Sequence, residues 1–128
     1  MIIDSSAVVA VLKRELPQEE MVTKLAQAEV VAIGSPTLFE TDIVTIRALG
    51  EHGRGLLAQF LDNFEVEVIP FKDSHRQVAA EAFLRFGKGR HPAGLNYGDC
   101  MTYATARIAG KPLLYIGNDF GQTDIEAA

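Results

Sequence analysis

The sequence predicts an α/β protein with three layers (α/β/α), in which a mostly parallel central sheet lies between helices. Short apolar runs alternate along the chain with longer segments whose apolar residues recur at helical spacing, and this order is typical of βαβ units. The first of these runs, "MII", has no alternating polar residues, as expected of a strand covered on both faces. A length of 128 residues suits one domain spanning residues 1–128.

The beginning of the chain predicts a strand followed by two helices. "MII" is a short buried strand, and either Ser5 or Ser6 can cap the helix that follows it. The stretch "PQEEMVTKLAQA" predicts a second helix from Pro17, because acidic residues occupy its first turn. The apolar run 30–33 then predicts the next strand, which Gly34 ends.

The middle of the chain predicts two helices and a strand. Ser35 and Pro36 are the expected cap and first residue of the helix "TLFETDIVTIRALG". The three glycines of "GEHGRG" are expected to interrupt the chain before another helix, which begins near Leu56. The run "VEVIP" predicts the third strand.

The last third predicts two more helices and a final strand. Asp73 and Ser74 are possible caps for the helix that contains "QVAAEAFLRFG", which Gly87 ends. A basic, glycine-rich loop, "KGRHPAGLN", leads into the helical pattern "YGDCMTYATARIAG". The run 113–116 is the expected fourth strand.

Composition narrows the class of protein. The formal net charge of −5 has the wrong sign for binding nucleic acid by overall charge. No apolar stretch is long enough to span a membrane, and the first residues lack the basic region of a signal peptide. These features, together with the single cysteine, Cys100, favour a cytoplasmic location and no membrane partner.

Acidic side chains follow the predicted strands and begin the predicted helices. Asp4 follows the first strand, and Asn118 and Asp119 follow the last. If these strands are parallel, the residues share one edge of the sheet, which is where ligands bind in α/β folds. Glu40 and Asp99 lie near the starts of helices that begin at the same edge.

Several carboxylates at one point repel each other unless a cation neutralises them. Mg²⁺ is the expected ion, with Mn²⁺ as a possible substitute, because both take oxygen ligands. Such a site is suited to phosphodiester hydrolysis, with Ser6 supporting a bound water or a neighbouring carboxylate. Each acid alone could equally be a helix cap or a turn residue.

Four ordered segments of the chain resemble the PIN-domain ribonucleases, and within them the VapC toxins of bacterial toxin–antitoxin pairs. These segments are "MIIDSSAVVAVL", "SPTLFETDIV", the stretch from "VEVIPFKDS" to "YGDCMTYATA", and "PLLYIGNDFGQTDI". Together they cover nearly the whole chain. Two positions depart from the common pattern, since Ile116 stands where lysine is common and Ser5 where threonine is usual.

The resemblance implies a set of site residues. Asp4, Glu40 and Asp99 would be catalytic, metal-binding acids, and Ser6 the hydroxyl that supports them. The fourth acidic position falls at Asn118 or Asp119. Either Asn118 coordinates the metal through its amide oxygen, or Asp119 substitutes as the acid.

The resemblance also implies an activity and partners. It implies a Mg²⁺-dependent endoribonuclease toxin that hydrolyses RNA phosphodiester bonds, with structured RNA such as transfer RNA as its substrate. A cognate VapB-like antitoxin would hold it inactive, and the toxin would form a homodimer.

A basic cluster precedes the helix that carries Asp99. Its members Arg85, Lys88 and Arg90, with His91 beside them, are expected either to hold the RNA backbone or to form an ordinary solvated loop.

Two other classes of protein remain open. A Mg²⁺-dependent phosphatase of the haloacid type would need a second aspartate two residues after Asp4, where Ser6 stands. A non-catalytic module that binds RNA or antitoxin is favoured only by Asn118.

The remaining reactive side chains are not expected to form a site. The three histidines do not have metal-ligand spacing, and His52 and His75 are expected at the surface. Cys100 is expected to be a core residue rather than a nucleophile.

Overall fold

The sheet has four strands, all parallel, in the order β3-β2-β1-β4. In this computed structural model, which describes all 128 residues, the strands are short: β1 (Ile2–Ile3), β2 (Ala32–Gly34), β3 (Glu67–Ile69) and β4 (Leu113–Leu114). The sequence-based prediction of a largely parallel sheet is therefore confirmed. The fourth strand is shorter than predicted, because it ends at Leu114.

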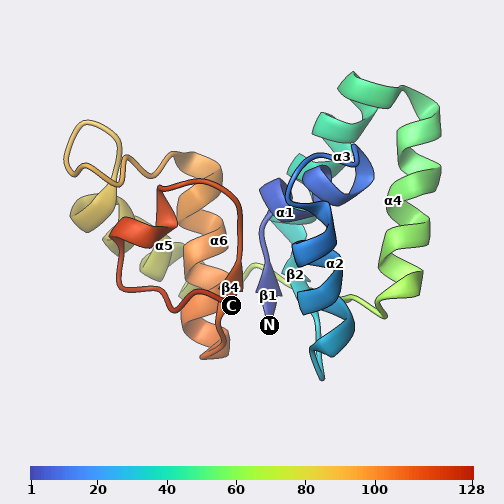
Figure 1. Ribbon diagram of the computed structural model, residues 1–128. Helices are drawn as coiled ribbons and strands as arrows, with labels where there is room; N and C mark the ends of the chain where they lie inside the picture. The colour runs from blue at the N-terminus through green and yellow to red at the C-terminus, as the bar shows by residue number, and fades with distance from the viewer.

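Helices cover both faces of this sheet (Figure 1). One layer holds α5 and α6, and the other side holds the helices of the first half of the chain, with α3 contacting α1, α4 and α6. The predicted α/β/α layers are confirmed. The helices are α1 (Ser5–Leu12), α2 (Gln18–Gln27), α3 (Ser35–Leu49), α4 (Glu51–Asn63), α5 (Asp73–Phe86) and α6 (Tyr97–Ala109), followed by the 3₁₀ turn η1 (Phe120–Gln122). None of these helices combines the length and the apolar character that a membrane-spanning segment needs.

Adjacent residues of the inner strands pack into different layers, because side chains alternate across a strand. In β1, Ile2 belongs to the apolar cluster formed with α5 and α6, whereas Ile3 belongs to the cluster formed with α1, α2 and α4. Leu113 and Leu114 of β4 divide in the same way. Burying each such side chain contributes about 1.5–3 kcal/mol, so both helical layers are held to the short strands.

Helix α4 begins earlier than predicted. It starts directly after Gly50, whose φ of 64° breaks the chain, so that Gly53 and Gly55 lie inside the helix and not in a loop. At Gly53, a Cβ atom would lie 2.5 Å from the Thr45 carbonyl oxygen of α3. Gly53 is therefore needed for the close packing of α3 on α4. The prediction of a loop here was wrong because it rested on the local abundance of glycine alone.

Three helix starts also differ by one residue from the prediction. The residues that precede α1, α3 and α5 are Asp4, Gly34 and Lys72, so the expected caps become the first residues inside each helix. Only Asp4 of these three caps with a carboxylate, which accepts a hydrogen bond from the Ser6 backbone N–H. Asp4 is therefore a helix cap as well as a candidate site residue.

The C-terminal segment runs along the outer edge of β4. The Leu113 N–H donates to the Glu126 carbonyl, and the Ala128 N–H donates to the Leu113 carbonyl, both at 2.9 Å. Leu113 and Ala127 thereby form a parallel bridge. The backbone groups of β4 that face away from β1 are thus hydrogen-bonded within the chain.

Candidate functional site

Four acidic residues approach one another at the carboxyl edge of the sheet. Asp4 directly follows β1, and Asp119 lies in the segment after β4, which pairs with β1. Glu40 lies in the second turn of α3, and Asp99 in the first turn of α6. Both helices begin at this edge, α3 directly from the end of β2.

Asp4 is the most buried of these acids, with 6% of its surface exposed. Its Oδ2 accepts hydrogen bonds from the Ser6 backbone N–H at 3.0 Å and from the Ser6 hydroxyl at 2.6 Å. Its Oδ1 accepts from the Thr102 hydroxyl at 3.0 Å. A carboxylate has about four acceptor positions, so one position, on Oδ1, is left for a ligand.

Ser6 also connects Asp4 to the segment after β4. The Ser6 hydroxyl donates to Asp4 and accepts a hydrogen bond of 3.0 Å from the Ile116 backbone N–H. The segment that carries Asp119 is therefore fixed close to Asp4 through one hydroxyl. Ile116 takes part through its backbone, so the absence of a lysine there leaves this contact intact.

Glu40 lies against the first turn of α6. Burial raises the pKa of its carboxyl group, and the negative charges of Asp4 and Asp99 raise it further. A Cβ atom built on Gly98 would lie 2.9 Å from Glu40 Oε2 and 3.1 Å from Oε1. Only glycine at position 98 leaves the Glu40 carboxylate its observed place beside α6.

Asp99 is positioned by the N-terminal cap of α6. Its Oδ2 accepts from the Asn96 N–H at 3.0 Å, and its own N–H donates to Asn96 Oδ1 at 2.9 Å. Burial raises the pKa of the Asp99 carboxyl group, the hydrogen bond from Asn96 opposes this effect, and the charges of Asp4 and Asp119 raise the pKa further. Asp99 thus interacts with acids from both strand ends.

The two residues considered for the fourth acidic position differ in this structure. Asp119 is close enough to Asp99 for its charge to affect the Asp99 pKa. Asn118 and Asp119 are both exposed, and the Asn118 backbone carbonyl accepts a hydrogen bond of 3.4 Å from the Gln122 side chain. Of the two residues, Asp119 is therefore the one whose charge acts on Asp99.

The donor atoms at this edge are suited to a hard divalent cation. Asp4, Glu40, Asp99 and Asp119 offer only carboxylate oxygens, which Mg²⁺ and Mn²⁺ prefer. No three histidine, cysteine or acidic side chains are gathered closely enough here to hold one ion. Two features still match a cation. Burial, together with the charges of neighbouring acids, raises the pKa of Glu40 and Asp99, and Asp4 has an unused acceptor position.

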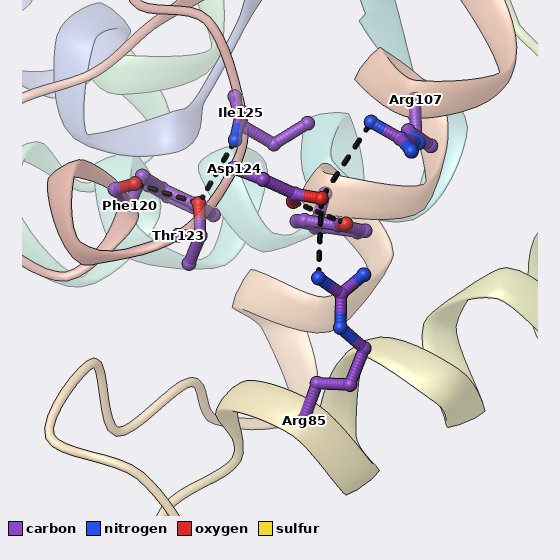
Figure 2. Close-up of polar contacts among 7 residues, drawn as sticks. Arg85, Arg107, Phe120, Thr123, Asp124 and Ile125 are labelled. Carbon is purple, nitrogen blue, oxygen red and sulfur yellow. Dashed lines mark hydrogen bonds and ion pairs between the residues drawn. The ribbon is translucent and has the colours of Figure 1, made fainter.

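The three residues of the basic cluster are all exposed, and only Arg85 forms an ion pair. Arg85 forms an ion pair with Asp124 at 3.3 Å, and Asp124 also accepts a 2.6 Å hydrogen bond from the Tyr103 hydroxyl and lies 3.7 Å from Arg107 (Figure 2). Arg85 therefore holds the C-terminal segment against α5 and α6. Lys88 and Arg90 lie in the loop before α6 and form no ion pair, although Arg90 Nε donates a hydrogen bond of 3.3 Å to the Leu84 carbonyl.

The structure places one histidine differently from the prediction. His75 is 5% exposed and not at the surface, because its Nδ1 accepts the Lys72 backbone N–H at the start of α5 and its ring packs near Phe71. Cys100 is buried, as predicted, and burial raises the pKa of its thiol to about 11. The thiol is therefore protonated near neutral pH and unsuited to nucleophilic attack.

Two residues beside the acids were not singled out from the sequence. Thr102 contacts Asp4, and Gly98 makes room for Glu40. Their positions in the sequence could have pointed to them. Gly98 directly precedes Asp99 and Thr102 lies three residues after it, so both share the first turns of α6 with Asp99.

Comparisons with known proteins agree on one family. The family model described as PIN domain matches residues 1–126. Ribonuclease VapC36 of Mycobacterium tuberculosis is 44% identical over 127 residues, which cover 98% of this chain and 91% of the relative.

Solved structures share the fold at lower identity. The M. tuberculosis toxin VapC20, described as cleaving the sarcin–ricin loop, superposes with a TM-score of 0.80 at 20% identity, covering 99% of this chain and 97% of the other. VapBC2 of Rickettsia felis, bound to a DNA fragment from its promoter, gives a TM-score of 0.79 at 16% identity, covering 99% and 96%.

Proposed function

Because the chain belongs to the PIN-domain family, and within it to the VapC group, we propose that it is an endoribonuclease toxin that depends on Mg²⁺, with Mn²⁺ as a possible substitute. The observation that carries this proposal is the convergence of Asp4, Glu40, Asp99 and Asp119 on one edge of the sheet, where burial and mutual charge raise the pKa of Glu40 and Asp99. Relatives named as ribonucleases support the reaction class.

In this proposal Asp4, Glu40, Asp99 and Asp119 would hold the cation once their side chains move closer together than in this structure, where no three of them are near enough to share one ion. Ser6 orients Asp4 from the side of Oδ2. A bound Mg²⁺ would polarise the scissile phosphate and lower the pKa of the attacking water. Asp4 presents one open position on Oδ1, between hydrogen bonds that fix the rest of its carboxylate. Asn96 holds Asp99 in a single orientation through the α6 cap.

RNA binding needs positive charge, because both the chain and the site are acidic. We assign contacts with the phosphate backbone to Lys88 and Arg90, which are exposed in the loop leading to Asp99. Arg85 contributes less in this assignment, since Asp124 already pairs with it. Structured RNA such as transfer RNA is the proposed substrate, and the cytoplasm the proposed site of action.

The proposed regulator is a VapB-like antitoxin encoded with the toxin. The resemblance in fold to VapBC2, a toxin–antitoxin pair, supports such a partner. We also propose that residues 1–128 form one PIN domain that assembles as a homodimer.

Cleavage of total transfer RNA by purified, antitoxin-free protein tests the proposal. We expect cleavage with Mg²⁺, none with EDTA, and at least a hundredfold slower cleavage by Asp99→Ala, on the order expected when a group that stabilises the transition state is lost. Asp62→Ala on α4, which removes an exposed acid outside the site, should cleave normally.

Two results would contradict it. Cleavage that persists in EDTA would rule out the metal-dependent mechanism. A folded protein that binds transfer RNA but cleaves no RNA, including ribosomal RNA, would instead support the non-catalytic binding module.

A further inference from the structure

A chain of buried hydroxyl groups leads from α3 through α6 to Asp4. Thr37 Oγ1 lies 3.0 Å from Thr102 Oγ1, and Thr102 Oγ1 lies 3.0 Å from Asp4 Oδ1. The exposed fractions of Thr37 and Thr102 are 2% and 1%. Water therefore does not compete for these bonds.

The direction of the chain follows from counting protons. An ionised carboxylate only accepts, so the single hydroxyl proton of Thr102 is donated to Asp4. Thr37 must then be the donor in its bond with Thr102. The bonds point in one direction, from Thr37 to Thr102 to Asp4, and donation to a charged acceptor is stronger than a bond between neutral groups.

Other buried threonines on the same helices behave differently. Thr41 and Thr45 of α3 and Thr105 of α6 donate to backbone carbonyls of their own helices, at 2.8, 2.9 and 3.0 Å. Such bonds satisfy a hydroxyl locally and connect no elements. Within this set, only Thr37 and Thr102 link one helix to another and to an acid.

These hydrogen-bonded hydroxyl groups join the elements that carry three of the four acids. Thr37 lies one turn before Glu40 on α3, and Thr102 lies one turn after Asp99 on α6. Asp4 directly follows β1 and caps α1. We propose that Thr102, supported by Thr37, is a positioning residue that orients the Asp4 carboxylate, so that the open position of Oδ1 faces a divalent cation. This proposal rests on the metal site of the proposed function.

The test is Mn²⁺ affinity of the purified protein, measured by isothermal titration calorimetry. Thr102→Val keeps the shape of the side chain and removes its hydroxyl, and we expect about 10- to 100-fold weaker Mn²⁺ binding, the usual effect of losing a group that orients a ligand. Thr102→Ser restores the donor and should bind within about threefold of wild type. Thr105→Val, on the same helix, should bind as wild type does.

Each outcome decides the question. Wild-type affinity in Thr102→Val, or no Mn²⁺ binding by wild type, would overturn the inference. If Thr102→Val does not fold, as judged by circular dichroism, Thr37→Val replaces it. Weaker Mn²⁺ binding by Thr37→Val supports the role of the two hydroxyl groups, and unchanged binding overturns it. A protein that binds Mn²⁺ with the expected pattern but cleaves no RNA would refute the proposed function and leave this inference standing.

Discussion

Replacing Gly98 by alanine should separate activity from stability. The new Cβ would lie 2.9 Å from Glu40 Oε2, so this oxygen must retreat by about 0.5 Å to regain van der Waals separation. The clashing atoms are the end of a flexible side chain, which can rotate away with little loss of stability. Alanine also favours the helix over glycine by roughly 0.5–1 kcal/mol.

We therefore expect a more stable but slower enzyme. The melting temperature of Gly98→Ala should be unchanged or rise by roughly 2–4 °C. A misplacement of 1 Å can reduce a rate about 10²-fold, so a shift of half this size should reduce RNA cleavage by about tenfold.

The assay compares the rate of RNA cleavage with thermal unfolding for Gly98→Ala and a matched control. Gly55→Ala makes the same change inside α4, where nothing lies within 4 Å of the added Cβ. The control should gain similar stability and cleave RNA at the wild-type rate. Full activity of Gly98→Ala would refute the assignment of Glu40 to the site, and a large loss of stability would refute the steric reasoning.

Four other predictions concern packing, titration and thiol reactivity. Gly53→Ala places its Cβ 2.5 Å from the fixed carbonyl of Thr45, so urea unfolding should show a loss of about 1–3 kcal/mol. The Tyr103 pKa is raised to about 12 by burial and by its bond with Asp124, so the unfolded chain ionises first and stability should fall as the pH rises from 10 to 12. The Asp124 pKa is lowered by its hydrogen bond from Tyr103, so the ionised carboxylate should stabilise the fold above pH 3.8, and this stabilisation should be lost in more acidic solution. The stability of Asp124→Asn should therefore change less with pH during acid unfolding. Cys100, buried with a pKa raised to about 11, should react with Ellman's reagent at pH 8 far more slowly in the native protein than in urea.

Sequence patterns were sufficient for the architecture and for the placement of the acids along one edge of the sheet. The apolar runs of β1 and β4 follow from buried β-branched and leucine residues, and their parallel pairing brings the residues after them to one edge. The helix starts were less certain, because several polar residues in a row can each cap. At α1, Asp4 became the cap even though Ser5 and Ser6 were available.

What escaped prediction depends on contacts between distant segments. Gly53 resembles a loop residue until the approach of α3 is known, and His75 resembles a surface residue until its Nδ1 is seen to accept the Lys72 N–H. The role of Thr102 has the same origin, because its partner Asp4 lies 98 residues away in the chain. The proposal of Asp119 for the fourth acidic position likewise depends on where Asp99 lies.

The segment along β4 has a consequence for how the protein behaves in concentrated solution. A free sheet edge offers backbone donors and acceptors to another molecule and promotes aggregation. At the β4 edge, both backbone groups of Leu113 are already hydrogen-bonded to Glu126 and Ala128, while the opposite edge strand, β3, exposes the charged Glu67. Removing residues 126–128 would expose Leu113 to pairing between molecules, so the shortened chain should precipitate at concentrations where the full chain stays in solution.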